Sequence, residues 1–245
     1  MSLTLARRAS AEFAGTALLV AAVVGSGIAA ARLSPTDVGL QLLENAIATA
    51  LALGALILTF GPVSGAHFNP VVSAVDWWLG RRAGTGLTGR DLAAYTAAQT
   101  GGAVTGAVLA DLMFNLPAVA WSRTERAGGN LWLAEVIATA GLVVLVFALA
   151  RSDRTTAAPA AVGAYIGAAY WFTSSTSFAN PAVTIGRAFT DTFAGIAPTS
   201  VPGFVAAQLV GGLVGVAALA AWYPHAGDAA DDVLVPHLPE ETEAR

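Results

Sequence analysis

Two Asn-Pro pairs, each opening an apolar run too short to cross a bilayer, constrain the fold of this chain most. Asn69-Pro70-Val71 opens a run that ends at Leu79, before two arginines. Asn180-Pro181-Ala182 opens the second run. Asn is a favoured helix N-cap and Pro a favoured first helical residue. About ten helical residues span roughly 15 Å, half of a ~30 Å hydrocarbon core. Each pair therefore predicts a half-helix that starts near the middle of a membrane.

The rest of the chain is apolar enough to enclose two half-helices. Of its 245 residues, 56% are hydrophobic and 11% charged, and the mean hydropathy is +0.65, values typical of membrane proteins. The absence of cysteine and the three scattered histidines predict no metal site and no cofactor, and the net charge of −4 argues against a nucleic-acid partner. Six apolar segments are expected to span the lipid bilayer: residues 9–31, 39–61, 91–114, 131–150, 157–176 and 201–223.

The arginines between these segments predict the orientation of the chain. The run after Arg7-Arg8 is too long for a signal peptide and has no clear cleavage motif, so we expect it to be retained as a span. One side of the membrane would carry Arg7, Arg8, Arg81, Arg82, Arg90, Arg151 and Arg154, and the other Arg32, Arg123 and Arg126. The positive-inside rule then places both termini in the cytoplasm of a multi-pass protein of the inner (plasma) membrane.

The two halves of the chain resemble each other in sequence. Each half has a Glu on its first span (Glu12 and Glu135), then Asn-Pro after its second span, then a Gln on its third (Gln99 and Gln208). With three spans per half, the halves insert with opposite orientation, so this is an inverted repeat with a shared site at its interface. We predict one channel domain over residues 1–224, with repeats at about 8–114 and 130–224. Residues 225–245 are expected to form an acidic, disordered cytoplasmic tail.

Two half-helix starts that meet inside a membrane would form a polar site. Each start carries the equivalent of about +0.5 charge, so the pair repels cations. The carboxamides of Asn69 and Asn180 can donate hydrogen bonds to a passing oxygen atom. The segments that lead into them are expected to run extended and to line a water-filled path, where irregular backbone is tolerated. Their carbonyl oxygens would form a ladder of acceptors from Gly65, Ala66, His67, Phe68, Ser175 and Thr176.

Three ionisable side chains near these loops have two interpretations each. Glu12 and Glu135 lie within spans, where carboxylates have a role more often than not. They can form a proton relay, or each can accept hydrogen bonds from the re-entrant loop of its own half. Their repeat-related positions favour the second, loop-supporting role. His67 can gate the path or sense pH, but a pore-lining or loop-packing role is favoured.

Four motifs together resemble the major intrinsic protein family, the aquaporins and aquaglyceroporins. They are Ala-Glu-Phe-Ala-Gly-Thr at 11–16, Ser-Gly-Ala-His-Phe-Asn-Pro at 64–70, Ala-Gln at 98–99 and Asn-Pro-Ala at 180–182. The resemblance extends over residues 8–224. It implies an all-α membrane protein with six tilted transmembrane helices and two re-entrant half-helices in an inverted repeat. It also implies one pore per protomer and a homotetramer.

The chain departs from this family where the resemblance implies a selectivity filter. Most members have an Arg directly after the second Asn-Pro-Ala, but this chain has Val183. Arg187 follows one helical turn later and is expected not to reach the same position. Replacing Arg by Val removes a charge and a fork of five donors, so we expect an uncharged filter without strict water selectivity. The first motif also departs, because Val71 replaces the usual Ala and crowds that half-helix start.

The other filter positions follow from alignment with the family. Thr49 matches the filter position on the second helix, and Ser177 matches the one in the second loop. The segment before the second Asn-Pro is shorter than usual, so the position on the fifth helix has two candidates. Counting back from the second Asn gives Ala168, which would make the filter wide, and aligning on Gly163 gives Tyr170.

The sequence predicts a passive channel for small uncharged solutes and no enzyme, since no nucleophile–base pair or metal-ligand set is present. A Val-for-Arg filter resembles a bacterial branch of the family linked to arsenic detoxification. That likeness favours metalloid hydroxides such as arsenite, or methylated arsenicals, beside water and polyols. The alternatives are a glycerol or urea facilitator and a non-conducting scaffolding membrane protein on the same fold.

Overall fold

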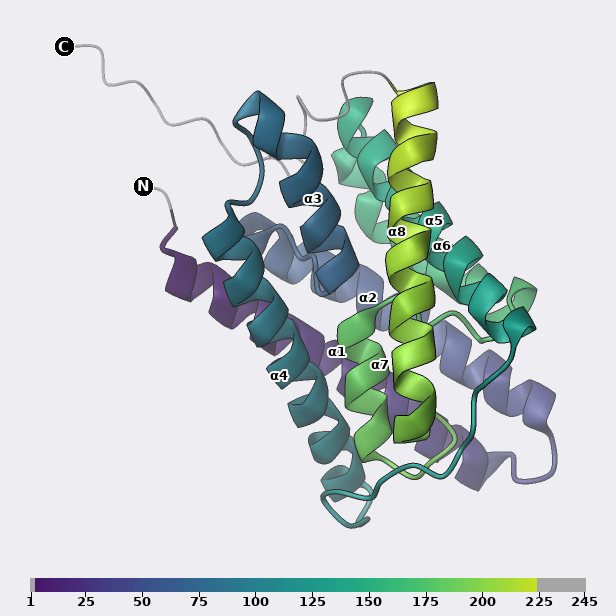
Figure 1. Cartoon of the computed structure of the whole chain (residues 1–245). Helices are drawn as coiled ribbons and strands as arrows, with labels where there is room; N and C mark the ends of the chain where they lie inside the picture. The colour runs from purple at the N-terminus through teal and green to yellow at the C-terminus, as the bar shows by residue number, and fades with distance from the viewer. Residues whose placement is uncertain (1–2, 224–245) are drawn as a thin grey trace.

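The structure, a computed structural model, describes residues 3–223, and all regular secondary structure within that range is helical (Figure 1). The predicted acidic tail, residues 225–245, lies outside the described residues. Three short 3₁₀ turns, η1 (Thr155–Ala157), η2 (Arg187–Phe189) and η3 (Pro198–Ser200), flank α-helices. The α-helices are α1 (Leu5–Leu33), α2 (Val38–Ser64), α3 (Pro70–Ala83), α4 (Gly89–Met113), α5 (Gly129–Arg151), α6 (Ala158–Phe172), α7 (Pro181–Gly186) and α8 (Val201–Trp222).

Six of these helices lie where the apolar segments predict spans, and α3 and α7 start directly after the two Asn-Pro asparagines. Within residues 3–223, four helical segments are long and apolar enough to cross a membrane by length and composition: Leu5–Leu33, Val38–Ser64, Gly129–Arg151 and Pro198–Trp222. Helix α1 begins four residues before the predicted segment, and α6 ends at Phe172, four residues before the predicted end at 176. The backbone leaves the helical region at Thr173, where the second re-entrant loop begins.

The two half-helices point in opposite directions from the middle of the molecule (Figure 1). The side chain of Asn69 caps α3 by accepting from the N–H of Val71 at 2.9 Å. Asn180 caps α7 by accepting from Ala182 at 3.0 Å and from Val183 at 3.2 Å. Each cap satisfies amide groups that would otherwise be unpaired at a helix start. The antiparallel placement of α3 and α7 is the inverted repeat that the sequence predicts.

Close glycine contacts join the first and third long helices of each repeat. A Cβ on Gly102 would lie 2.3 Å from the carbonyl oxygen of Phe13, and one on Gly106 would lie 2.2 Å from that of Ala17. A Cβ on Gly211, in α8, would lie 2.7 Å from a backbone oxygen of α5. These distances are shorter than any ordinary contact, so α1 approaches α4, and α5 approaches α8, only because these residues have no side chain.

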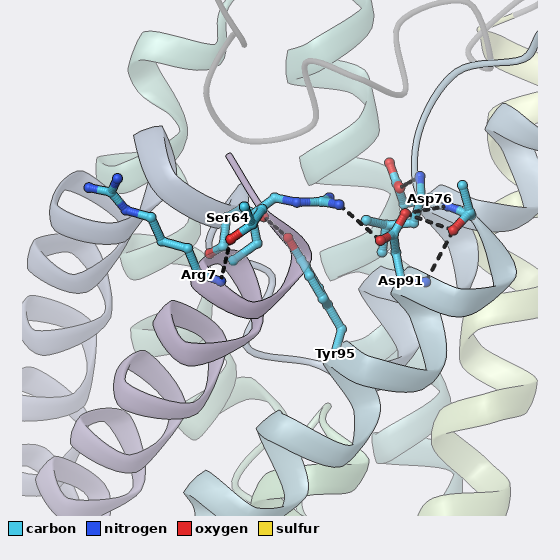
Figure 2. A network of polar contacts seen from close by, with 9 residues as sticks. Arg7, Ser64, Asp76, Asp91 and Tyr95 are labelled. Carbon is cyan, nitrogen blue, oxygen red and sulfur yellow. Dashed lines mark hydrogen bonds and ion pairs between the residues drawn. The ribbon is translucent and has the colours of Figure 1, made fainter. Parts of the chain in front are cut away.

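A polar network fixes the end of the molecule at which α1 and α4 begin (Figure 2). Arg8 forms an ion pair with Asp91 at 2.9 Å, and Tyr95 donates to the carbonyl oxygen of Ser64 at 2.8 Å. Asp76, on α3, accepts a hydrogen bond of 2.7 Å from a backbone N–H of the loop before α4. The first half-helix and its flanking loops are therefore held against the long helices.

Candidate pore and its lining

The first re-entrant loop is held by one buried carboxylate. Oε1 of Glu12 accepts from the hydroxyl of Ser64 at 2.6 Å and from the N–H of His67 at 3.0 Å. Oε2 accepts from the N–H of Phe68 at 2.7 Å and from the side-chain amide of Gln99 at 2.8 Å. These four bonds connect α1 to the end of α2, to the loop and to α4, and Glu12 is fully buried.

The second loop repeats this arrangement. Oε1 of Glu135 accepts from the hydroxyl of Ser175 at 2.6 Å and from the N–H of Phe178 at 2.9 Å. Oε2 accepts from the N–H of Ala179 at 2.8 Å and from the side-chain amide of Gln208 at 2.7 Å. These are the contacts of the loop-supporting interpretation, because both oxygens of each carboxylate are occupied by the loop and its neighbouring helix.

The re-entrant loops are not extended, contrary to the prediction. Three residues in each loop have a positive φ of 48° to 84°: Gly65, Ala66 and Phe68 in the first, and Thr176, Ser177 and Ala179 in the second. Five of these six have a side chain, and such a residue in the left-handed region costs about 1–3 kcal/mol. The hydrogen bonds to Glu12 and Glu135 lie beside these residues and offset that cost.

The two loops are joined to each other by reciprocal hydrogen bonds. Nδ2 of Asn69 donates to the carbonyl oxygen of Ala179 at 2.8 Å, and Nδ2 of Asn180 donates to that of Phe68 at 2.7 Å. Each carboxamide nitrogen carries a second hydrogen, which remains available to a solute. The half-helix starts therefore meet, as the sequence predicts, and both asparagines line a common cavity.

That cavity has a volume of about 60 Å³ and is lined by both apolar and polar side chains. One water needs about 10–15 Å³ on the same scale, so the cavity holds about four to six waters. Its apolar wall comes from equivalent residues of the two repeats: Leu19, Val23, Leu53, Ile57 and Val72 in the first, and Leu142, Val146, Val162, Ile166 and Val183 in the second. Its polar groups come from Thr49, His67, Asn69, Tyr170, Ser177, Asn180 and Arg187.

Of the two candidates on the fifth long helix, only Tyr170 lies against this cavity. Ala168 is on the exposed face of α6, because residues two positions apart on a helix point in nearly opposite directions. The hydroxyl of Tyr170 is 3.2 Å from that of Thr49 across the cavity, and both residues are buried. The wide constriction that Ala168 would give is therefore absent from this structure. Ser177 also lines the cavity, and its buried hydroxyl has no hydrogen-bond partner within residues 3–223.

Arg187 does not take the position of Val183, but it borders the same cavity. Arg187 lines the same cavity as Val183, one turn further along α7 and η2. Two residues four positions apart lie on the same face of a helix, which explains this placement. The expectation of an uncharged lining fails for the same reason, since a guanidinium borders the cavity.

The predicted carbonyl ladder is only partly formed. Ala66, His67 and Phe68 line the cavity, but Gly65, Ser175 and Thr176 are not among its lining residues. The carbonyl oxygen of Phe68 already accepts from Asn180. Its counterpart on the second loop belongs to Ala179, a cavity-lining residue that the sequence reasoning missed.

His67 packs within the first loop and also borders the cavity. Its Nδ1 lies 3.0 Å from the hydroxyl of Ser73, and its ring makes an edge contact with Tyr95 at 5.5 Å between centroids. Gln99 donates to the same Ser73 hydroxyl at 3.0 Å, and Gln208 donates to Thr184 at 2.8 Å. Ser73 and Thr184 each follow their Asn-Pro asparagine by four residues, and this spacing could have identified them from the sequence.

Two loops pair with each other beyond the end of α7. Residues 114–128 pair with residues 187–200 through backbone bonds such as Ala120 to Phe189 at 2.9 Å. Asp191 accepts from the backbone N–H of Arg123 at 2.9 Å and from its guanidinium at 2.7 Å. These bonds, the backbone one first, hold the pKa of Asp191 below its ordinary value.

The fold and the site define a class of membrane protein: a passive channel with two opposed half-helices. The sequence model of the family described as major intrinsic protein matches residues 1–177. The chain belongs to the major intrinsic protein family, the aquaporins and aquaglyceroporins, whose members are channels for water and small solutes.

Among its relatives, "Aquaglyceroporin AqpS" of Rhizobium meliloti (strain 1021) is 53% identical over 213 residues, 87% of this chain and 88% of the relative. "Probable aquaporin AqpM" of Archaeoglobus fulgidus is 32% identical, over 91% of this chain and 97% of the relative. The solved structure titled "X-ray structure of the aquaglyceroporin from Plasmodium falciparum" superposes with a TM-score of 0.62 at 21% identity. It covers 90% of this chain and 96% of its own, and it supports the aquaporin fold.

Proposed function

We propose that the channel admits small uncharged solutes that carry several hydroxyl groups, together with water. These are glycerol-sized polyols and metalloid hydroxides such as arsenite, with methylated arsenicals of similar size. The observation that carries this proposal is the mixed lining of the cavity, in which aliphatic side chains and hydroxyl and amide groups border one space. A polyol exposes both carbon-bound hydrogens and hydroxyl groups, so this lining offers contacts to each.

Val183 is the residue on which the solute preference depends. An Arg at this position would extend toward the Thr49–Tyr170 contact and narrow a cavity of about 60 Å³. Val leaves that space free for a solute larger than water. The relative described as an aquaglyceroporin supports glycerol among the permeant solutes.

Stopped-flow uptake into vesicles that contain the purified protein tests this preference. We expect parent vesicles to take up glycerol and arsenite, and Val183→Arg to lower glycerol flux about tenfold, a barrier change of about 1.4 kcal/mol. Water flux should fall less, because water needs less width. Parent vesicles that pass water but neither glycerol nor arsenite would contradict the proposal. The ratio of the arsenite uptake rate to the glycerol uptake rate separates a metalloid channel from a glycerol or urea facilitator.

We also infer the assembly and location of the protein. Large apolar side chains such as Leu51, Leu58 and Leu213 are at least 66% exposed, which suits contact with lipid or with neighbouring protomers of a homotetramer. The arginine distribution supports an inner-membrane protein with both termini in the cytoplasm. Both oxygens of Glu12 and of Glu135 are occupied by bonds that support the loops, and the family consists of channels, so we propose a transport role without catalysis.

A further inference from the structure

Arg187 is held at the edge of the cavity by two contacts on one side of its guanidinium. Its Nε donates to the carbonyl oxygen of Ala194, and its Cζ lies 3.4 Å from the centre of the Phe178 ring. The residue is only 2% exposed. A guanidinium stacked on an aromatic face is fixed in orientation and gains cation–π stabilisation. The side chain is therefore pre-positioned and not free to swing away from the cavity it lines.

The rest of the guanidinium is left to the cavity. Within the part of the chain that the structure describes, its two terminal nitrogens have no hydrogen-bond partner and its charge has no carboxylate partner. Neither of these nitrogens is fully enclosed by protein atoms, so both are accessible to a small molecule. An uncompensated charge in a low-dielectric wall produces a strong local field.

Arg126 provides a contrast on the same aromatic ring. Its Cζ lies 5.3 Å from the ring centre of Phe178, but its Nε and a terminal nitrogen donate to the carbonyl oxygens of Gly195 and Phe193. Arg126 does not line the cavity. Of these two arginines, only Arg187 combines unpaired donors with contact to the solute path.

The inverted repeat shows what a purely structural residue at this position does. The residue equivalent to Arg187, counted from the Asn-Pro asparagine of the first repeat, is Asp76. Asp76 accepts from the N–H of Leu87 and so anchors the loop after its half-helix, and it does not line the cavity. The bond from Arg187 to Ala194 does the same for the second loop. Unlike Asp76, Arg187 also lines the cavity.

A second unpartnered group lies on the same cavity. The hydroxyl of Ser177 is buried without a hydrogen-bond partner, and Ser177 is 3% exposed. A buried hydroxyl without a partner is unfavourable unless a solute or water satisfies it. The guanidinium of Arg187 and the hydroxyl of Ser177 are therefore available to bind an oxygen atom in transit.

We propose that Arg187 is the selectivity-determining charge of this pore. Its terminal nitrogens donate hydrogen bonds to oxygen atoms of the permeating solute, with the Ser177 hydroxyl as a further partner, and its charge opposes cations. The proposal rests on the channel function of the family and adds a residue one turn beyond the position where most members have Arg. Val183 is small enough to leave the approach to this guanidinium open.

The test compares purified parent, Arg187→Gln and Arg126→Gln proteins in vesicles. Leak of protons and ammonium ions is followed with an internal pH dye, and water and glycerol fluxes are measured on the same preparations. We expect Arg187→Gln to raise the cation leak per channel about tenfold or more, which corresponds to about 1.4 kcal/mol of barrier. It should also alter the ratio of glycerol to water flux, while Arg126→Gln leaves both at the parent value.

Two further variants separate charge from structure. Arg187→Lys keeps the charge and loses the donor fork, so we expect a parent-like cation leak with a lowered glycerol-to-water ratio. Val183→Arg in the Arg187→Gln background returns a charge to the cavity wall and should restore the low leak. If Arg187→Gln does not fold, the Lys variant alone decides, and parent values for both of its readouts overturn the donor role.

Folded Arg187→Gln with parent leak and parent flux ratio would overturn the proposal and leave Arg187 as a loop anchor only. This result is distinct from failure of the proposed solute range, which is measured on the parent protein alone.

Discussion

Replacing Glu135 by Gln should destabilise the second re-entrant loop without changing its shape. Glutamine retains one acceptor oxygen, but it presents an amide NH2 group where the other carboxylate oxygen accepted two hydrogen bonds. The least damaging orientation places the amide NH2 group beside Ser175, whose hydroxyl can rotate and accept a hydrogen bond from it. The N–H of Phe178 is then left without its acceptor, 2.9 Å away in the parent. One buried donor without a partner costs about 1–3 kcal/mol, and loss of the charge weakens the remaining bonds.

The effect should reach transport, because the loop residues concerned include left-handed Thr176, Ser177 and Ala179. Thermal unfolding of purified Glu135→Gln in detergent should show a lower midpoint than the parent, and vesicle water flux per protein should fall. The equivalent variant Glu12→Gln should behave in the same way, since its four bonds are equivalent.

Glu125→Gln is the matched control for this loss. Glu125 is exposed, and within residues 3–223 its carboxylate accepts hydrogen bonds from Thr199 and Ser200, so the midpoint of Glu125→Gln should stay near that of the parent. A Glu135→Gln protein with the parent midpoint and the parent flux would refute the loop-supporting role. Unchanged stability with altered proton movement would favour the relay interpretation instead.

Three further predictions follow from other contacts. Gly106→Ala should be strongly destabilising, because the new Cβ would lie 2.2 Å from the carbonyl oxygen of Ala17. The control is Gly89→Ala, whose Cβ would meet no atom closer than 3.9 Å. A comparison of the unfolding midpoints of the two variants tests this prediction. Asn180→Ala removes the α7 cap and one cross-loop bond. We expect the free energy of unfolding to fall by about 1–2 kcal/mol from the cap alone, and the flux to fall as well. A variant as stable as the parent would count against the reciprocal bonds. Asp191 has a lowered pKa, so the stability it contributes is present above its ordinary pKa and is lost as the pH falls through the folded value. Acidification should therefore lower the unfolding midpoint of the parent more than that of Asp191→Asn, which has no carboxylate to protonate, and identical pH profiles would contradict this assignment.

The half-helices and the repeat could be predicted because their signals are local. A capping Asn, a following Pro and a run length are readable without knowledge of the packing, as with Asn69 and Asn180. The support from Glu12 and Glu135 could be predicted because the same acid recurs at the same place in both halves. Each of these features depends on few residues that are near in sequence or related by the repeat.

Features that depend on packing could not be predicted in this way. The positive φ of Ala66 and Phe68 runs against the preference of residues with side chains, and only the hydrogen bonds to a distant helix stabilise it. Whether Tyr170 or Ala168 faces the cavity depends on the rotation of α6 about its own axis. The sequence does not fix this rotation, because the segment between α6 and the second Asn-Pro pair is shorter than usual in the family. The placement of Arg187 depends on the ring of Phe178, a partner that no spacing pattern indicates.

The most direct measurement for the whole account is solute flux through vesicles that contain the purified chain, compared with empty vesicles and with an Asn69→Ala, Asn180→Ala double variant. The joined loop tips should give the parent a protein-dependent flux of water and glycerol that is much reduced in the double variant. Parent flux no greater than that of empty vesicles, or a properly folded double variant with undiminished flux, would contradict a solute path that runs past these two asparagines.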